Sequence, residues 1–470
     1  MSFLFQNIKK LGYLYLIFFV ISCKGPEELD LTNIENQIIN FNEYSIEDVN
    51  FPTINITTDG KDIVDEPKIN ASLLVIEDNN QNNYNIGIEL RGSSSQMFPK
   101  KSYGFETKNS DYSDEIDINL GGFPEEEDWI LYGPYSDKSL IRNKLTFDLS
   151  NLIGYKASNT KFYDLYINND YKGLYILMEK IKRDKNRVDI PKINDNSVEG
   201  GYILKIDKPT GESSPSGGSC NTCYDSSFSF KSKYNSNGQL SQNSKIHFIF
   251  HYPKPKDITD NQKQYIQNFI DQFEFVLSSN NFDNNLIPEY ISLIDIDSFI
   301  DFFIMNEITK NIDGYRLSTF IYLDDDKKLN MGPIWDFNLA FGNVDYCDGA
   351  NTEGWLYNFN NICPGDVWQV PFWWSTLMDS QYFKEKLKTR WDFLRQDLFS
   401  NISINNKINS YVIDLNSNDV INQNFKIWPI IGEYIWPNYY VGNSYESEID
   451  FMKNWIDMRL TWLDAEIGKL

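Results

Sequence analysis

Two short apolar runs separated by a charged turn lie in the second half of the chain, at residues 317–323 and 329–335. Both runs are rich in β-branched and aromatic residues, and the turn reads Asp-Asp-Asp-Lys-Lys, a pattern that predicts a β-hairpin. Asp313 precedes the first run and Asp336 follows the second, so both carboxylates would lie at the open end of the hairpin. Two carboxylates beside apolar strands repel each other unless a cation or a proton offsets their charge. The pattern predicts a metal site, and two turn aspartates that cap strand ends are the alternative.

The N-terminus has the features of a lipoprotein leader. Two lysines precede an apolar run over residues 11–21, and Val-Ile-Ser leads to Cys23. Small and apolar residues directly before the cysteine predict a signal peptide over residues 1–22 and lipidation of Cys23. The apolar run is about half the roughly 20 residues that span a bilayer, so we expect a lipid rather than a helix as the anchor. An uncleaved signal anchor with an incidental cysteine is the alternative. Residues 23–50 are polar and predict a tether. The acidic stretch at 24–28 resembles surface-export signals of some Bacteroidetes lipoproteins, which predicts anchoring at the outer membrane of a bacterium, on its periplasmic or surface face.

Charge and composition narrow the classes of function. The formal net charge is −24, so we expect no nucleic-acid partner and contact with a membrane only through the lipid. Hydrophobic residues make up 41% of the chain, which is enough for a large folded core. The chain has only two histidines, His247 and His251, both in or beside a strand-like segment. We interpret both as structural, which argues against a histidine-rich zinc site and against a Ser-His-Asp hydrolase.

Four cysteines remain besides the lipidation site. In an oxidising compartment their spacing favours two disulfides, Cys220–Cys223 and Cys347–Cys363, over one zinc site built from two distant pairs. The first pair also forms a Cys-x-x-Cys motif. It lies in a loop rich in glycine and serine rather than at a strand-to-helix junction, so the sequence argues against a redox function.

A glycine–serine loop between two strand-like runs has the composition of a phosphate-binding element. It lies between residues 84–90 and 102–107. Glycine allows close approach of the backbone, N–H and hydroxyl groups donate to phosphate oxygens, and lysines offset the charge. The spacing is not that of a Walker loop, and a serine-rich hairpin turn is the alternative. The candidate phosphate-binding residues of this segment are Arg91, Ser93, Ser94, Lys100 and Lys101.

Two further charged residues are candidates for the same site. Arg142 stands among apolar residues on a predicted helix that runs through Leu149, where it would reach a phosphate or pair with an acid in the core. Glu179 lies on the outgoing strand of a second predicted hairpin, over residues 162–180. Some phosphate-binding sites use a Lys–Glu pair to hold a lysine on the phosphates, so Glu179 and Lys101 are a candidate pair. An exposed glutamate at a strand end is the alternative.

Several of these segments resemble motifs of one family. Asn-Ile-Asp at 311–313 and Trp-Asp-Phe-Asn at 335–338 are similar to the Asn-x-Asp and Trp-Asp-x-Asp patterns of the spore-coat protein H (CotH) kinase-like family. The glycine–serine loop and the segments at 129–143 and 200–207 resemble further motifs of that family, and the resemblance extends from about Asn70 to the C-terminus. It implies an α+β, atypical protein-kinase-like fold with two lobes that binds ATP and magnesium.

The expected organisation follows from this resemblance and from the composition. Residues 51–245 predict a β-rich N-terminal lobe with a mixed or antiparallel sheet, and residues 246–470 a largely helical C-terminal lobe that carries the catalytic hairpin, 313–338. The stretch 209–245 is rich in serine, glycine and asparagine and predicts an insertion loop.

The resemblance implies phosphoryl transfer from ATP to a hydroxyl group of a protein, with Ser or Thr as the family acceptor, or of a glycan. Asp336 would hold Mg²⁺ on the phosphates with Asn338 as a further ligand, and Asp313 would orient or deprotonate the acceptor. Two positions depart from the expected patterns. Ser318 stands where a kinase has asparagine, and Asn338 replaces an acid.

Two other functions stay open, because ATP is scarce outside the inner membrane. One is a catalytically silent surface lipoprotein that binds a glycan or a partner protein through a kinase-like fold. The other is a metal-dependent enzyme that uses the same carboxylates on a substrate other than a nucleotide.

Overall fold

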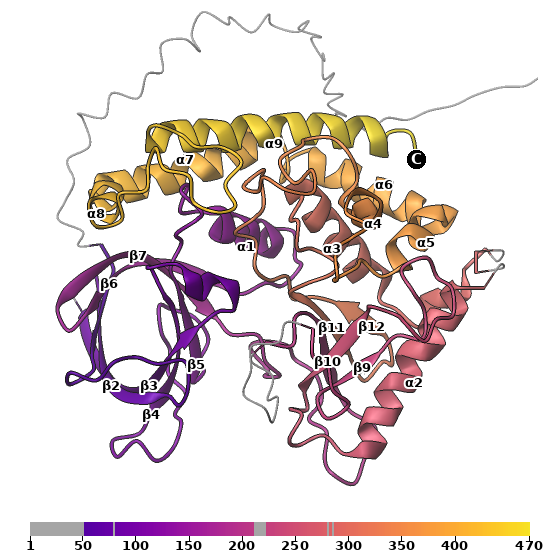
Figure 1. Ribbon diagram of the computed structural model, residues 1–470, viewed down its shortest axis with the longest axis horizontal. Coiled ribbons are helices and arrows are strands. Elements are labelled where there is room, and N and C mark those ends of the chain that lie inside the picture. Colours follow the sequence, from indigo (N-terminus) through magenta and orange to yellow (C-terminus); the bar gives the residue numbers. More distant parts are fainter. Residues whose placement is uncertain (1–50, 79, 211–221, 280–281, 284–285) are drawn as a thin grey trace, which may run out of the picture. The chain divides into compact units, whose positions relative to one another are not determined.

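The computed structural model of the chain describes residues 51–78, 80–210, 222–279, 282–283 and 286–470 (Figure 1). These residues belong to one compact unit, Val49–Leu470. The expected leader, the lipidation site Cys23, the tether and Cys220 lie outside the described residues. Among the helices that the structure describes, none is both long enough and apolar enough to cross a membrane.

A closed barrel opens the described part of the chain. Its seven strands are β1 (Thr53–Thr57), β2 (Ile69–Glu77), β3 (Asn80–Arg91), β4 (Ser102–Lys108), β5 (Asp128–Tyr132), β6 (Thr160–Ile167) and β7 (Asp170–Glu179). The order around the barrel is β1-β2-β3-β4-β5-β7-β6, and β1 closes it by pairing in parallel with β6. Side chains such as Ile54, Ile56 and Ile88 are fully buried in one apolar cluster of these strands. Closure satisfies both edges of the sheet, which an open sheet would leave unpaired.

A second sheet has five strands, all paired antiparallel in the order β12-β11-β8-β10-β9. They are β8 (Tyr202–Ile206), β9 (Ser229–Lys231), β10 (His247–Tyr252), β11 (Thr319–Leu323) and β12 (Leu329–Met331). The boundary that we expected between residues 245 and 246 falls inside this sheet, because β8 and β9 precede it and the other strands follow. The stretch 209–245 also contains β9, so it is not an insertion loop throughout. Pairing between segments so far apart in the sequence leaves no local signal.

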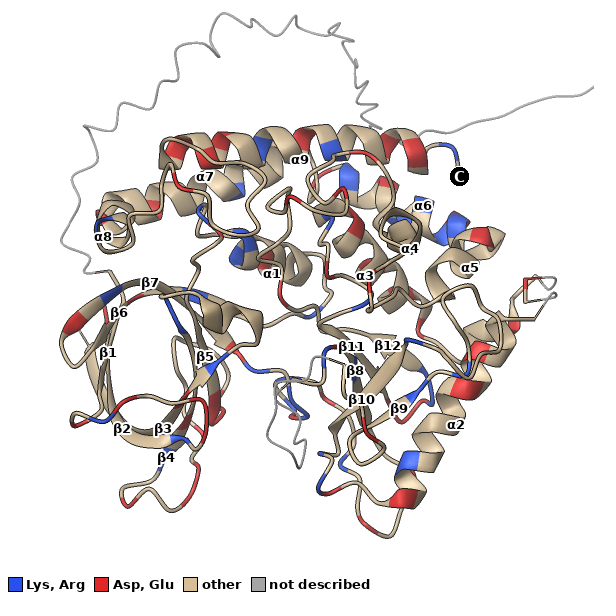
Figure 2. Cartoon of the chain, in the orientation of Figure 1, with Lys and Arg blue, Asp and Glu red and all other residues tan. Residues whose placement is uncertain are grey.

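The helices lie almost entirely in the second half of the chain. They are α1 (Arg142–Leu152), α2 (Asp260–Leu277), α3 (Ile296–Thr309), α4 (Phe359–Ile362), α5 (Trp373–Asp379), α6 (Gln381–Arg395), α7 (Asn401–Ser417), α8 (Val420–Ile427) and α9 (Tyr445–Ile467). The α+β class expected from the sequence is confirmed. Acidic and basic residues are interspersed along α2, α6 and α9, so the negative charge is spread over the molecule (Figure 2).

Helix α3 forms the centre of the larger core. Asp295 caps its N-terminus, because the Asp295 carboxylate accepts the N–H of Ser298 at 2.8 Å. Every residue of the helix from Phe299 to Thr309 is buried. It packs against α1, α6, α9 and β12 (Figure 1). Lys310 ends the helix in the left-handed conformation, at φ 44°, which turns the chain directly into Asn-Ile-Asp at 311–313.

A buried ion pair fixes this end of α3. The Glu307 carboxylate lies 2.9 Å from Arg459 of α9, and both side chains are almost completely buried. Glu307 also accepts the N–H groups of Leu356 and Tyr357, at 2.8 and 3.0 Å, and the hydroxyl of Tyr315 at 3.1 Å. The Glu307 carboxylate therefore connects α3 and α9 to two later segments of the chain, one at Tyr315 and one at residues 356–357.

Glu274 on α2 gives a test of the packing around the second sheet. Its carboxylate accepts the Ser232 hydroxyl at 2.7 Å and the Trp373 indole N–H at 3.0 Å, and burial raises its pKa from 4.5 to about 8. The folded state therefore keeps a proton that the unfolded state loses, and this contribution to stability declines as the pH rises from about 4.5 through about 8. We expect Glu274→Gln to remove a slope of up to about 1.4 kcal/mol per pH unit from the free energy of unfolding.

Urea denaturation between pH 5 and 9 measures this slope, and Glu289→Gln is the control because Glu289 is exposed. Equal slopes for the wild type and Glu274→Gln would contradict the assignment.

Candidate active site

The expected hairpin is present, with shorter strands than the sequence pattern suggested. Strands β11 and β12 pair from Ile321 opposite Met331 to Leu323 opposite Leu329. The ladder ends there because Pro333 has no N–H to donate and Ser318 has a positive φ, 48°. Asp313 and Asp336 both lie beyond the open end.

Asn311 joins the two halves of the site. Its Nδ2 donates to the backbone carbonyl of Asp336 at 3.2 Å, so the first position of the Asn-x-Asp motif holds the second aspartate in place. Asp336 has φ 62°, a conformation that residues other than glycine rarely adopt and that is enriched at functional sites. The Oδ1 of Asn311 is buried, and no donor among the described residues reaches it.

The carboxylate of Asp336 lies among other charged groups. Loss of hydration, and then the negative charges of Asp313 and Asp207, raise its pKa to about 7, and the positive charges of Lys208 and Arg91 oppose this shift. Asp207 follows β8, the strand next to β11, and burial raises the pKa of its carboxyl as well. Asp207 and Lys208 carry no local signal in the sequence, because only the strand order brings the end of β8 beside the hairpin.

The glycine–serine loop closes over the segment that follows β8. The Ser94 hydroxyl accepts a hydrogen bond from Lys208 Nζ at 3.3 Å, and the hydroxyls of Ser93 and Thr210 are 3.0 Å apart. Arg91, the last residue of β3, lies with its guanidinium 5.8 Å from the centre of the Trp335 ring. The structure therefore brings three predicted loop residues, Arg91, Ser93 and Ser94, into contact with the residue before Asp336 or with the segment that follows β8.

The two lysines of the loop have other partners. Lys100 is buried, and its Nζ donates at 2.8 Å to Asn424 Oδ1, which also accepts the N–H of Leu174 in the barrel. Lys100 therefore connects the barrel to α8 instead of facing the site. Lys101 Nζ donates to the carbonyl of Gln96 at 2.5 Å and so stabilises the loop from within.

Arg142 and Glu179 also differ from the expectation. Arg142 is buried, pairs with Asp137 at 2.6 Å and donates Nε to the carbonyl of Ala340 at 3.0 Å. It supports the backbone after Asp336 and does not face the loop. Glu179 pairs with Arg187, not with Lys101, so the expected Lys–Glu pair was wrong. The partner of Glu179 comes from a turn that the sequence did not mark.

Arg316 fixes the orientation of Asp313. Its Nη2 lies 3.0 Å from Asp313 Oδ1 and its Nη1 lies 3.4 Å from Asp366 Oδ1. The guanidinium is 2% exposed and stacks on the Phe359 ring, 4.0 Å from the ring centre. This arginine stands three residues after Asp313, a signal that sequence reasoning passed over.

One disulfide closes the loop that carries Phe359. Cys347 and Cys363 are bonded, with their Cα atoms 5.7 Å apart, as the spacing suggested. The other expected pair includes Cys220, which the structure does not describe.

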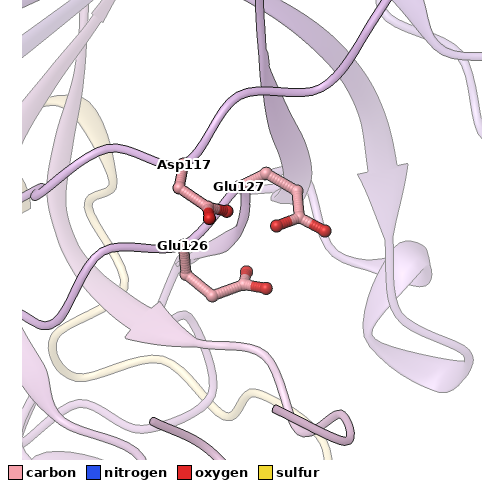
Figure 3. A group of neighbouring side chains, drawn as sticks. All are labelled: Asp117, Glu126 and Glu127. Carbon is pink, nitrogen blue, oxygen red and sulfur yellow. The ribbon is translucent and has the colours of Figure 1, made fainter. Parts of the chain in front are cut away.

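A further group of acids lies on the barrel, away from the hairpin. Asp117, Glu126 and Glu127 approach one another closely (Figure 3). Lys182 Nζ lies 2.6 Å from Glu126 and 2.5 Å from Glu127, so an ammonium group already offsets the charge. We assign this group to stability of the barrel rather than to metal binding.

These features define an α+β protein whose candidate active site combines carboxylates, cationic side chains and a serine-rich loop. The model of the family described as CotH kinase protein matches residues 88–463, and the chain belongs to this family. The resemblance seen in the motifs is thus confirmed.

The chain is also 24% identical to the inner spore coat protein H of Bacillus subtilis (strain 168) over 291 residues. That match covers 60% of this chain and 65% of the relative, so the chain spans just under two thirds of the relative's length.

Replacing Cys347 and Cys363 with serine tests whether the disulfide stabilises the fold through the loop that carries Phe359. The bridge closes a loop with a sequence separation of 16, and its loss should lower the free energy of unfolding by about 3 kcal/mol. Denaturation of the wild type and of the double variant, both under oxidising conditions, measures the difference. An unchanged midpoint would show that the bridge does not stabilise this loop.

Proposed function

We propose that this protein is an ATP-dependent, magnesium-requiring phosphotransferase that acts on a hydroxyl group, at a site outside the cytoplasm to which a lipid on Cys23 anchors it at the outer membrane. The observation that carries the proposal is the convergence of Asp313 and Asp336 at the open end of one hairpin, opposite the serine-rich loop and Lys208. Membership of the family described as CotH kinase protein supports it.

The phosphate side of the proposed site comes from the barrel and from the segment after β8. Ser93 and Ser94 are exposed, so their hydroxyls are accessible to a ligand. Lys208 and Arg91 supply positive charge near Asp336. Together these groups would donate to the oxygens of a triphosphate and offset its charge.

The donor set next to Asp336 fits a hard divalent cation. Carboxylate and amide oxygens are the ligands that Mg²⁺ takes, and the buried Oδ1 of Asn311 has no donor among the described residues. Asp336 is the proposed principal ligand, and Asn338 and Asp207 are candidates for further contacts. A bound Mg²⁺ would neutralise charge on the phosphates.

Asp313 would act on the acceptor. The acceptor oxygen forms a bond to the terminal phosphorus of ATP, the bond from that phosphorus to the ADP oxygen breaks, and the hydroxyl proton passes to the Asp313 carboxylate. Arg316, held between Asp313, Asp366 and Phe359, keeps this carboxylate in one orientation.

Asp336→Asn tests the cation site. Asparagine has the same shape without the charge, so Mg²⁺-dependent ATP affinity should fall on the order of a hundredfold, a loss of about 3 kcal/mol, while the fold remains. Calorimetric titration of the full chain with MgATP, and with ATP plus EDTA, measures the effect. Asp325→Asn, in the exposed turn of the same hairpin, is the matched control. If the folded wild type does not bind MgATP, the proposed function is wrong.

Lys208→Met tests the phosphate contacts that the sequence did not reveal. Removing a cation that donates to phosphate should weaken MgATP binding about tenfold or more and leave the binding of adenosine unchanged. Lys327→Met, in the hairpin turn, controls for the change of net charge. Equal losses for MgATP and adenosine would indicate a general disturbance of the loop instead.

A further inference from the structure

Exposed aromatic side chains gather on the loop between α8 and α9. Tyr434, Trp436 and Tyr439 are 54%, 44% and 61% exposed, and all three lie within one short segment. Together with Tyr346 we call them the aromatic platform. Large aromatic rings exposed in one place mark a site of interaction more often than a chance surface.

The platform is held in place by a second loop. The Tyr434 hydroxyl donates to Asp345 Oδ2 at 2.7 Å, and the Asp345 N–H donates to the carbonyl of Pro437 at 2.9 Å. The rings of Tyr346 and Trp436 are nearly parallel, with an angle of 10° and centres 6.4 Å apart. The rings are thus ordered before any ligand arrives, which lowers the entropic cost of binding.

Tyr346 connects the platform to the neighbourhood of Asp313. The disulfide that directly follows Tyr346 bonds its loop to the segment that carries Asp366. Asp366 contacts Arg316, and Arg316 contacts Asp313. Burial and then the negative charge of Asp313 raise the pKa of Tyr346, which agrees with this short path.

The chemistry of the surroundings limits the ligand. Residues 343–353 and 430–444 contain no lysine or arginine, and the acids Asp345, Asp348 and Glu433 are exposed. Lys138, Lys310 and Arg459 donate to backbone carbonyls of these loops but are buried, so the exposed charge of the loops is negative and does not favour an anionic ligand. No strand occurs in residues 428–444, all of which the structure describes, so a peptide finds no edge here for strand pairing. A sugar ring has C–H groups on its faces and hydroxyls at its rim, which match flat aromatic rings flanked by carboxylates.

We propose that the aromatic platform binds a neutral glycan and presents one of its hydroxyls to Asp313 as the phosphate acceptor. Binding to the platform is independent of the proposed function, whereas use of the glycan as acceptor rests on it. The acceptor class is then carbohydrate, and the exposed rings determine which sugars bind.

The test is calorimetric titration of the full chain, without nucleotide, with maltohexaose, cellohexaose, mannohexaose and chitohexaose. We expect at least one to bind, and we expect Trp436→Ala to weaken that binding at least about tenfold, as for a central aromatic contact. Phe275→Ala is the matched control, because Phe275 is a 66% exposed aromatic residue on α2. Circular dichroism verifies that each variant is folded.

The remaining outcomes separate the platform from the phosphotransferase. Binding of an oligosaccharide by a chain that does not bind MgATP would support the platform and refute the proposed function. Asp313→Asn should keep glycan affinity while losing transfer of label from γ-labelled ATP to the oligosaccharide. No binding of any of the four sugars, equal binding by Trp436→Ala, or Trp436-dependent binding of a lysine-rich peptide in their place would overturn the glycan proposal.

Discussion

The buried pair of Glu307 and Arg459 is the interaction on which the arrangement of the site depends. Two opposite charges in an apolar core are tolerated only when every remaining donor and acceptor is satisfied, and here backbone N–H groups and a tyrosine hydroxyl complete the set around the carboxylate. This network holds together α3, α9 and the segment after the hairpin. The turn at the end of α3, which leads to Asp313, therefore has one fixed direction. The pair thus specifies geometry more than it adds stability.

Buried side chains around this ion pair hold the two aspartates of the site in position. The N-terminus of α1 holds the backbone after Asp336 through Arg142 and through Asn143, whose Oδ1 accepts the N–H of Phe337 at 2.6 Å. Arg316, stacked on an aromatic ring, holds Asp313. Asp313 and the backbone around Asp336 are therefore held by the buried side chains of Arg142, Asn143 and Arg316. This organisation allows a strained backbone at Asp336 to persist.

The parts of the fold and of the site that depend on neighbouring residues could be predicted from the sequence. The alternation of apolar residues indicated the hairpin, and the positions of its flanking acids indicated where they would meet. Closure of the barrel, the place of β8 beside β11, and hence Asp207 and Lys208, depend on pairing between distant segments, and no local pattern reports it. Glu179 was assigned to the wrong partner for the same reason, since Arg187 reaches it from a turn.

The register of the five-stranded sheet has a consequence for how the site comes into being. Asp207 lies more than a hundred residues before the hairpin that carries Asp313 and Asp336, and the pairing of β8 with β11 brings it to them. A slip of one residue between these strands would turn each side chain to the opposite face. A chain whose barrel is closed but whose five-stranded sheet is out of register would leave Asp207 away from the hairpin that carries Asp313 and Asp336. The complete set of three carboxylates therefore exists only when this sheet has its native register.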